Sequence, residues 1–504
     1  GTGNNEVPNE CIQTASSDVY SYVIEEDLLV DTDWCEILNS GNAFSRGISI
    51  NPGKKIIIPD GVSARFEYYS FDSCSDVLWD AIEVMPGGSL TLINCRISNG
   101  YNAIRAHEGA NLNLTRCTFT DNYVSLSLEG ETNPNIPVNP FNITFINNVF
   151  TGSGNLVDPF PGQSLVSNEL PYAGIELTGV SFADLAAPSP TSIATSNFFD
   201  NMHNGIVSRT SSFIVKEAHF SNMFELPNPD GNLISGYGIY ASNARSSNYN
   251  FFKLLDSSSE SLFSNMPVGI SMQNNMNSFI DKATMSSVER GVEVQNCVST
   301  SHIIKNSDIE ATEFGIKTVN NTPLFGTMEE NNISINGEYN PTPTVVSGGI
   351  VCSENTSRPG QSAGWNITGN EIFLQRGDMG IQYINGGGAK IADNRIYKSS
   401  GQKNFSFTLA QIINSPNTEI DCNILANLEG SANFSESIGL DVIDSPMMSI
   451  SCNDISFVEE AVHFDGPSEG TDFKANEMSN GFVALKLTSE ALISPQSHKG
   501  NCFN

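Results

Sequence analysis

The side chains able to do acid–base chemistry fall at one recurring place in this sequence. Glu83 and Arg105 each lie between two apolar residues of a short segment, and Asp441 and His463 do so much later in the chain. Alternation along a strand sends the two apolar residues to one side and the residue between them to the other. His107 follows Arg105 by two residues and shares that outer side. A carboxylate beside a cation or an imidazole is the combination that general acid/base catalysis requires.

The segments that carry these residues repeat. At a spacing of 22 residues, Ala81–Val84 corresponds to Ala103–Ala106, Leu90–Leu92 to Leu112–Leu114, and Asn94–Ile97 to Arg116–Phe119. Each unit holds short apolar/polar alternations separated by Gly, Asn and Ser, which is typical of brief half-buried strands and turns. The step of 22 residues returns from Gly269 to Gly291 and from Gly439 to Ala461. A period in the twenties indicates stacked repeats.

Stacking would bring outward residues of successive units to about 5 Å from one another. The predicted outer column is Glu83, Arg105, Ser125, Glu176, Val207, Tyr240, Ser271, Glu293, Lys317, Val351, Gln382, Thr408, Asp441 and His463. The column pairs Glu83 with Arg105, Glu293 with Lys317, and Asp441 with His463. Two interpretations stay open: surface pairs that fix the register at about 0.2–1 kcal/mol each, or one pair that acts as an acid/base couple.

A second column is expected inside. Its predicted members are Cys95, Cys117, Asn148, Asn197, Ala218, Asn331, Asn370, Asn394, Cys422 and Cys452. An inward Asn at a turn can bond the turn backbone and the next amide, and Cys tolerates burial, so we predict an asparagine ladder with cysteines near both ends. Cys95 with Cys117, and Cys422 with Cys452, come within disulfide reach, either bridged or packed as thiols. Cys11 and Cys35 are a further disulfide candidate.

These patterns predict an all-β chain folded as a right-handed parallel β-helix of about 15 coils with loop insertions. Three short strands fit one turn of about 22 residues, which favours the β-helix. The predicted helix covers residues 47–485. Residues 1–46 are expected to form an N-terminal cap, since a repeat stack must hide its first apolar layer. Residues 486–504 leave the pattern and form a C-terminal cap or the start of a continuing segment.

Composition limits the partners. The 24 Lys+Arg and 56 Asp+Glu give a net charge of −32, which repels nucleic acid and anionic lipid or polysaccharide. The acidic surface is either simply solvated or attracts divalent cations, so Ca²⁺ stays open, although no calcium-loop pattern occurs. No Cys or His spacing predicts another metal, and no cofactor is expected. No apolar run approaches the ~18 residues of a membrane span. The ten cysteines are compatible with an oxidising, extracellular compartment.

Insertions point to binding. Loops at 129–140, 183–192 and 353–365 leave one edge of the outer column, and loops at 151–173, 221–236, 337–347 and 429–437 enter the other. Loops on a rigid scaffold are where binding residues collect. The predicted ligand-binding residues are Tyr240, Glu293, Lys317, Trp365 and Gln382. Aromatic faces suit sugars, but such rings can equally pin the loops to the scaffold.

The coil length, the Gly-Ile strand and the inward Asn at a turn resemble the right-handed parallel β-helix superfamily. That superfamily holds pectate lyases and polygalacturonases beside non-enzymatic surface proteins. The ending His498–Cys502 and the irregular coils are similar to secreted repeat proteins of Bacteroidota. The resemblance implies catalytic motifs that this chain lacks: Asn-Thr-Asp, Asp-Asp, Gly-His-Gly and Arg-Ile-Lys of the hydrolases, and Trp-x-Asp-His and Arg-x-Pro-x-x-Arg of the lyases.

The missing motifs favour a non-catalytic secreted or cell-surface β-helix. We expect it to act in adhesion, on a carbohydrate or cell-surface ligand, or as a self-associating building block of an extracellular filament. The alternative is a polysaccharide lyase or hydrolase with its site on the loop-walled outer face. For that alternative the candidate catalytic residues are Glu83, Arg105, His107, Asp441 and His463.

Overall fold

The chain divides into two compact units, unit 1 (Gly1–Pro267) and unit 2 (Val268–Asn504). The computed structural model describes residues 12–13, 22–37, 46–132, 141–166, 169–180, 194–226, 234–242, 251–255, 260–274, 277–299, 301–323, 326–337, 347–354, 364–376, 378–399, 406–428, 436–495 and 500–503. The regular elements of these residues are all strands. None of the described segments is a helix long and apolar enough to cross a membrane.

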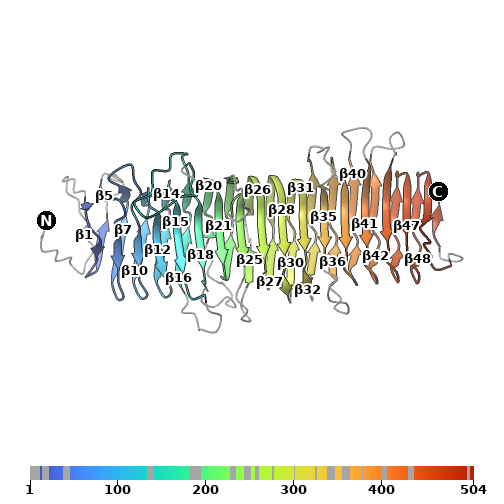
Figure 1. Ribbon diagram of the computed structural model, residues 1–504, viewed down its shortest axis with the longest axis horizontal. Coiled ribbons are helices and arrows are strands. Elements are labelled where there is room, and N and C mark those ends of the chain that lie inside the picture. Colours follow the sequence, from blue (N-terminus) through green and yellow to red (C-terminus); the bar gives the residue numbers. More distant parts are fainter. Residues whose placement is uncertain are drawn as a thin grey trace. The chain divides into compact units, whose positions relative to one another are not determined.

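In unit 1 each coil contributes one strand to each of three columns (Figure 1). Column A consists of β1 (Ile12–Gln13), β4 (Trp34–Ile37), β7 (Ser63–Glu67), β10 (Ser89–Ile93), β13 (Asn111–Thr115), β16 (Asn142–Ile146), β19 (Ala194–Thr195), β22 (Phe213–Lys216) and β25 (Phe251–Leu255). Column B consists of β2 (Tyr22–Ile24), β5 (Gly47–Ile50), β8 (Ser70–Ser73), β11 (Arg96–Ser98), β14 (Thr118–Thr120), β17 (Val149–Thr151), β20 (Phe198–Met202), β23 (His219–Met223) and the part of β26 (Ser261–Gln273) up to Pro267. Column C consists of β3 (Leu28–Leu29), β6 (Ile56–Ile58), β9 (Ile82–Val84), β12 (Asn102–His107), β15 (Val124–Glu129), β18 (Ala173–Thr178), β21 (Asn204–Arg209) and β24 (Tyr237–Ser242).

Unit 2 repeats the three columns. Column A consists of β27 (Asn277–Asp281), β30 (Ser301–Lys305), β33 (Gly326–Glu329), β36 (Trp365–Thr368), β39 (Lys390–Ala392), β42 (Glu419–Asp421), β45 (Ser449–Ser451) and β48 (Asp472–Lys474). Column B consists of β34 (Asn332–Ile335), β37 (Glu371–Leu374), β40 (Arg395–Lys398), β43 (Ile424–Asn427), β46 (Asp454–Ser456), β49 (Glu477–Ser479) and β51 (Cys502–Phe503). Column C consists of β35 (Gly348–Ser353), β38 (Met379–Ile384), β41 (Phe407–Ile413), β44 (Ser437–Ile443), β47 (Glu460–Asp465) and β50 (Val483–Thr488). The long strands β28 (Ala283–Gln295) and β31 (Asp308–Val319) serve columns B and C, and β29 (Val298–Ser299) pairs with β32 (Thr322–Pro323) apart from them.

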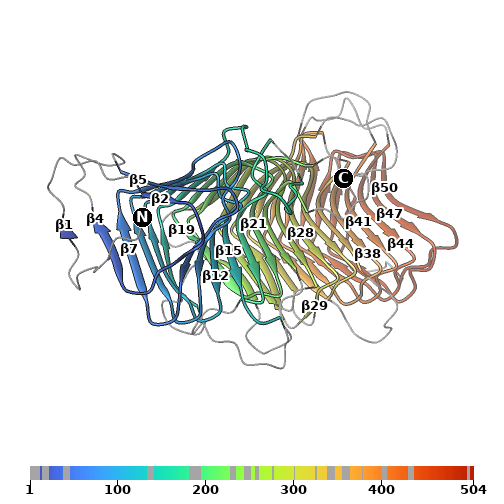
Figure 2. The same cartoon turned by 60° about the vertical axis from the view of Figure 1, so that its left-hand side comes forward.

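Consecutive strands of a column pair in parallel, in the register that the 22-residue step predicts. Leu90 faces Leu112, and Ile82 faces Ile104. In the turned view the same strands again lie side by side in chain order within each unit (Figure 2). Parallel strands joined by crossovers are nearly always right-handed. The predicted right-handed parallel β-helix is therefore the fold of this chain.

Parallel pairing reaches beyond the predicted helix limits of 47 and 485. On the N-terminal side Tyr22 pairs with Ile48, inside the segment expected to be a cap. On the C-terminal side Cys502 pairs with Glu477. The described parts of both terminal segments thus add strands to the columns.

The bend between columns A and B has two residues with different tasks. The first residue has a positive φ angle, and the side chain of the second points inward. In unit 2 the residues with positive φ at this bend are Lys282, Asn306, Glu330, Gly369, Asp393, Cys422, Cys452, Ala475 and Gly500. The inward residues that follow include Asn331, Asn370, Asn394, Asn423 and Asn453. Each inward side chain serves a neighbouring coil. Asn394 accepts from the Asn370 backbone N–H at 3.0 Å and donates to the Ile367 carbonyl at 2.8 Å. The predicted asparagine ladder is confirmed.

The ladder corrects the sequence assignment near its C-terminal end. Cys422 and Cys452 were predicted to point inward, but they hold the positive-φ position, at 53° and 61°. The inward residues are Asn423 and Asn453. The backbone N–H of Asn423 donates a hydrogen bond to Asn453 Oδ1 at 3.0 Å. Cys95 and Cys117 are inward as predicted, and both thiols are free and buried.

In the interior, residues of the same type stack on one another in successive coils. In unit 1 a buried phenylalanine column runs Phe119, Phe150, Phe199, Phe220 and Phe263, with ring centroids 4.7–4.9 Å apart. This spacing equals the separation of neighbouring strands, so the coil repeat itself places the rings in stacked contact.

The interior of unit 2 also holds a polar cluster. The Glu354 carboxylate accepts from Thr318 Oγ1 at 2.7 Å, the Asn321 N–H at 2.6 Å and Trp365 Nε1 at 2.9 Å. Burial raises the pKa of Glu354. His302 contacts Ser278 Oγ through Nδ1 at 2.7 Å, and burial lowers its pKa to about 4.

We expect Asn394→Ala to lower the free energy of unfolding by about 3 kcal/mol, because it leaves a buried N–H and a buried carbonyl without partners. Denaturant titration measures the change. The matched control is Asn332→Ala, at an exposed position of β34, with a change within about 0.5 kcal/mol. Equal effects of the two substitutions would contradict the ladder's role.

His302 predicts a loss of stability in acid. Its folded-state pKa lies below the ordinary 6.5, so the unfolded chain takes up the proton first, and stability falls between about pH 6.5 and about pH 4. The cost at pH 5 relative to pH 7 is about 2 kcal/mol. We expect His302→Gln to remove it, as measured by denaturant titration at both pH values, while Asn332→Ala on β34, which removes no titratable group, leaves it unchanged. Glu354 acts in the opposite direction but is present in every variant, so the difference isolates His302.

Candidate functional site

The candidate site lies on the outer face of column C in unit 1. There Glu83 of β9 pairs in register with Arg105 of β12, and Arg105 with Ser127 of β15. The next coil places Glu176 beside Ser127. The predicted neighbours Glu83 and Arg105 are therefore adjacent. Ser127, not Ser125, holds the third position, because β15 carries two serines and the register selects the later one.

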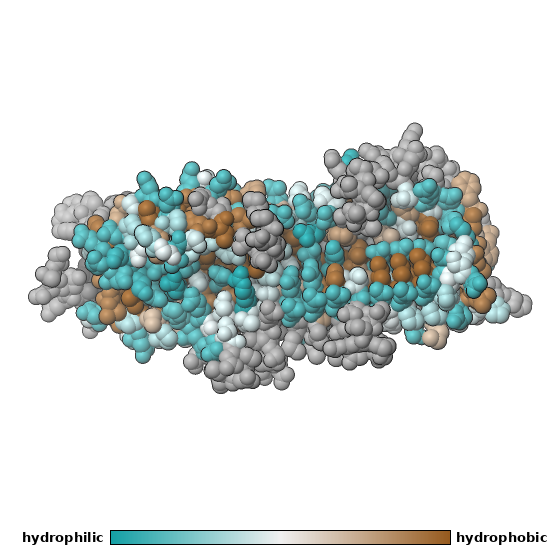
Figure 3. Space-filling model, in the orientation of Figure 1, coloured by the Kyte–Doolittle hydropathy of each residue, from teal (hydrophilic) through white to brown (hydrophobic). Residues whose placement is uncertain are grey.

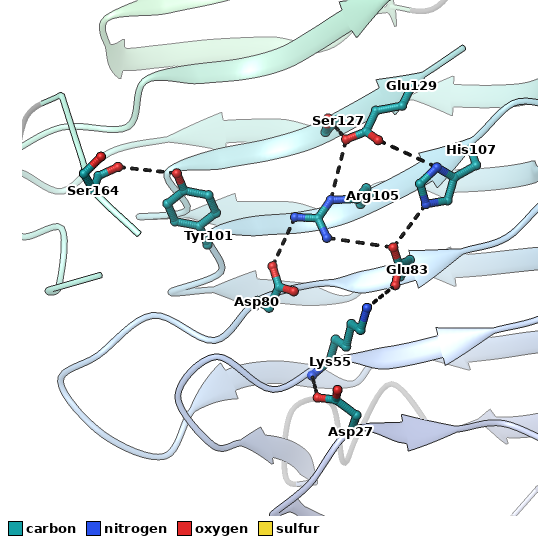
Figure 4. A network of polar contacts seen from close by, with 10 residues as sticks. All are labelled: Asp27, Lys55, Asp80, Glu83, Tyr101, Arg105, His107, Ser127, Glu129 and Ser164. Carbon is teal, nitrogen blue, oxygen red and sulfur yellow. Dashed lines mark hydrogen bonds and ion pairs between the residues drawn. The ribbon is translucent and has the colours of Figure 1, made fainter. Parts of the chain in front are cut away.

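Arg105 is the centre of the network in Figure 4. Its guanidinium contacts three carboxylates from the two neighbouring coils: Asp80 at 3.1 Å, Glu83 at 3.9 Å and Glu129 at 3.6 Å. Asp80 and Glu83 come from the coil of β9, and Glu129 ends β15. The strand register thus brings together residues that are distant in sequence.

His107 lies between two of these carboxylates. Its Nε2 is 3.1 Å from Glu83 Oε1, and its Nδ1 is 3.7 Å from Glu129 Oε2. Lys55 Nζ, from the preceding coil, is 2.7 Å from Glu83 Oε2. Burial alone would raise the pKa of Glu83, but hydrogen bonds from Lys55 and His107 outweigh it and lower that pKa.

These environments divide the chemical roles. Glu83 stays ionised, so it acts as a hydrogen-bond acceptor and not as a general acid. His107 is within hydrogen-bond distance of Glu83 through Nε2. The Glu129 side chain is 45% exposed, against 12% for Glu83, so it is the network's accessible carboxylate. Prediction from sequence identified Glu83, Arg105 and His107 as candidates. Lys55 and Asp80 were missed because they lie just before strands β6 and β9, outside the predicted outer column.

An aromatic wall borders the network. Tyr101 stacks on Tyr123 at 5.1 Å, and Tyr123 stacks on Tyr172 at 5.8 Å. The insertion after β17 packs against them: Phe160 meets the Tyr101 ring edge-on at 5.7 Å, and Tyr101 Oη donates to the Ser164 carbonyl at 3.3 Å. Tyr123 and Tyr172 are buried, so these rings pin the insertion, while Tyr101 keeps partial exposure.

Farther along the same face, Glu176 pairs with Arg209, the residue register-matched to Thr178. Arg209 also contacts Tyr172 Oη at 3.4 Å. Side chains of both signs therefore follow the outer face beyond Glu129, again with each cation matched to an acid.

Unit 2 has a second polar row on its own column C. Gln382 donates to Gln411 at 2.8 Å, and Gln411 donates to Asp441 at 2.9 Å. Asp441 Oδ1 is 3.0 Å from His463 Nδ1, as the predicted pairing requires. His463 Nε2 then reaches Thr488 Oγ1 at 2.8 Å. Gln411 holds the place predicted for Thr408. Thr488 was missed because it is register-matched to Asp465, while Lys486 is the residue that follows His463 in the column.

An aliphatic row runs beside this polar row. Ile384, Ile413 and Ile443 are register neighbours at the ends of β38, β41 and β44, and all three are partly exposed. The outer surface therefore alternates between polar and apolar rows. On the face seen in Figure 3, hydrophobic atoms likewise lie in short rows between hydrophilic ones.

Several predicted binding residues are not on an open surface. Trp365 is 0% exposed and bonds Glu354 in the interior, and Glu293 is 2% exposed with its ion pair to Arg290 at 3.0 Å. Tyr240 is also buried. Lys317, the register neighbour of Glu293, lies 4.4 Å from the Phe314 ring centroid. Burial thus removes Tyr240, Glu293 and Trp365 as surface ligands for a sugar.

The predicted disulfide and metal-binding residues can be compared with the structure as well. Cys35 is disulfide-bonded, and its predicted partner Cys11 lies outside the described residues. Cys95, Cys117, Cys422 and Cys452 are free. In the described parts of the chain, no group of three or more His, Cys, Asp or Glu side chains is arranged to hold a metal ion.

We expect the Lys55–Glu83 contact to contribute measurably to stability. A double-mutant cycle with Lys55→Met and Glu83→Gln should give a coupling energy of about 1 kcal/mol, reduced at high salt. The neighbouring pair Lys54–Glu26 is the control, because the Glu26 side chain is 84% exposed and its coupling should be near zero. A similar coupling for both pairs would show that the network adds nothing to an ordinary surface contact.

No family model matches this chain, and no curated protein matches it. Solved structures do. The periplasmic alginate epimerase AlgG is 11% identical over 82% of this chain and 77% of its own, with a TM-score of 0.36. The tailspike protein of E. coli bacteriophage HK620, solved as a double mutant with a pentasaccharide, is 11% identical over 87% and 72%, with a TM-score of 0.40. The Yersinia enterocolitica family 28 exopolygalacturonase is 11% identical over 88% and 74%, with a TM-score of 0.27. At this identity and these TM-scores the likenesses are weak, and the right-handed parallel β-helix is assigned from the parallel strand pairing of this chain itself.

Proposed function

We propose that the outer face of column C in unit 1 binds a neutral carbohydrate chain. The observation that carries the proposal is the Arg105 network, in which hydrogen-bonding groups from adjacent coils converge beside an aromatic ring. Glycan binding is also the step that an adhesin and a polysaccharide-active enzyme share.

The charges of the network favour a neutral ligand over an acidic one. Arg105 already contacts Asp80, Glu83 and Glu129, and Lys55 is matched to Glu83. A site whose cations are all paired offers donors and acceptors to sugar hydroxyls but little attraction for a polyanion. The net charge of −32 acts in the same direction.

The geometry suits a linear polymer. Equivalent positions recur at about 4.8 Å along the column, so a chain lying along the face meets a new side chain at every coil. Tyr101 supplies a partly exposed ring at one border, and the insertion that bonds it through Ser164 supplies a wall. Sugar rings pack against aromatic faces while their hydroxyls bond polar neighbours.

An extracellular location is part of the proposal. The Cys35 disulfide supports it, since such bonds persist in oxidising compartments.

We expect the chain to bind a neutral polysaccharide, such as a xylan, mannan or β-glucan, in preference to polygalacturonate or alginate. Affinity electrophoresis and titration calorimetry measure this. Tyr101→Ala and Arg105→Met should each weaken binding about tenfold or more, the effect of losing a stacking face or a charged hydrogen bond. Lys390→Met is the matched control, because Lys390 forms an exposed ion pair with Glu419 in unit 2.

Circular dichroism of each variant separates lost binding from lost structure. Tighter retention by the uronate polymers, or equal binding by Tyr101→Ala and the parent, would refute the proposal. Release of reducing ends, abolished in Glu129→Gln while binding remains, would identify the site as catalytic.

A further inference from the structure

Two thiols hold the same place in adjacent coils of unit 2. Cys422 and Cys452 each occupy the positive-φ position of the bend between columns A and B. The Cys422 N–H donates to the Ser451 carbonyl at 3.0 Å, so the two bends are joined by their backbones at this point. Because both residues have the same backbone conformation, their side chains leave the bend in the same direction.

The strands on either side hold this alignment. Asp421 of β42 faces Ser451 of β45, and Ile424 of β43 faces Asp454 of β46. Neighbouring strands lie about 4.8 Å apart, inside the range of Cα separations at which a disulfide forms without moving the backbone. The hydrogen bond from the Asn423 N–H to Asn453 Oδ1, just inside the bend, is a third contact that holds the two coils in this register.

The two thiols also interact and can be reached from solvent. The neighbouring Cys452 thiol is the largest of the causes that raise the pKa of Cys422 to about 12. Cys452 is exposed and Cys422 is partly exposed. A small oxidant can therefore approach Cys452 directly.

A second pair of cysteines in adjacent coils serves as a comparison. Cys95 and Cys117 are stacked in the same way in unit 1, but on the inner side of the bend, and both are buried. Their thiols bond the Phe66 and Leu92 carbonyls at 3.3 Å. An oxidant in solution cannot reach them while the coil is folded.

We propose that Cys422 and Cys452 form a disulfide between adjacent coils in an oxidising compartment. With oxidised glutathione as the oxidant, the Cys452 thiolate attacks one glutathione sulfur, and one glutathione thiolate leaves and is protonated. The Cys422 thiolate then attacks the protein sulfur of that mixed disulfide and releases the second glutathione. Two protein thiols are oxidised, and one glutathione disulfide is reduced to two glutathione molecules.

The bond would join two residues that lie 30 positions apart in the sequence, at 422 and 452. The same two coils carry Asp441 on β44 and His463 on β47, whose contact at 3.0 Å belongs to the outer polar row. The disulfide would thus fix covalently the register on which that row depends.

The experiment incubates the full chain with oxidised glutathione and maps disulfides by mass spectrometry of unreduced peptides. We expect one new linked pair, Cys422 with Cys452, and a loss of two hydrogens. Cys74, an exposed cysteine without a stacked neighbour of its kind among the described residues, is the control and should carry glutathione instead. Cys95 and Cys117 should remain thiols.

Thermal unfolding gives a second readout. Oxidation should raise the Tm of the parent by about 5 °C relative to an equally treated Cys422→Ser variant, while the two should agree before oxidation. Recovery of Cys422 and Cys452 as free thiols, or as separate glutathione adducts, would overturn the proposal. A linked Cys95–Cys117 peptide in their place would overturn it as well.

Discussion

Hydrogen bonding of the buried bend is the constraint on which both units depend. Every coil turns a corner between columns A and B, and the inward side of that corner leaves backbone amides without strand partners. In unit 2 the side chain of one coil supplies the bond for its neighbour, as Asn394 does for Asn370. Because unpaired buried amides are costly, this exchange keeps successive coils in one register. The outer columns inherit that register, and with it the positions of their charged groups.

The same constraint explains what the sequence allowed us to predict. A fixed step of 22 residues gives the partner of any residue in a regular coil, so Glu83 with Arg105 and Asp441 with His463 follow from counting alone. Two members of the outer column were assigned wrongly. Ser127 lies 22 residues after Arg105, but the neighbouring Ser125 was predicted in its place. Gln411 lies 29 residues after Gln382, because the coil between them is longer, and Thr408 was predicted in its place.

The misplaced cysteines have a more specific cause. The bend reads Asn-Cys at 94–95 but Cys-Asn at 422–423 and 452–453. Asn accepts positive φ more readily than most residues, and it also suits the inward place. Both orders are therefore compatible with the local conformation, and sequence cannot separate them. The structure separates them through the neighbouring coil: the Asn423 N–H needs an acceptor on the inward side, and Asn453 supplies it.

Burial of individual outward residues could not be predicted from the repeat. Glu293 belongs to the outer column as predicted, yet it is covered, and Trp365, predicted as a binding residue at the end of a loop, belongs to the interior. The candidate site in unit 1 shows the opposite case, since the insertion after β17 lies beside the network and leaves Glu129 exposed. What covers a face depends on non-repeating segments, whose packing is decided by particular contacts such as Tyr101 with Phe160.

The outer half of the bend has a practical consequence. Asn, Glu, Asp, Cys, Ala and Gly all occupy the positive-φ position in unit 2, so this place demands a backbone conformation and little else of the side chain. A row of such positions, one per coil and evenly spaced, can accept engineered side chains without disturbing the interior. Labels, ligands or cross-linking groups could therefore be attached at these positions, at spacings chosen by the number of coils between them.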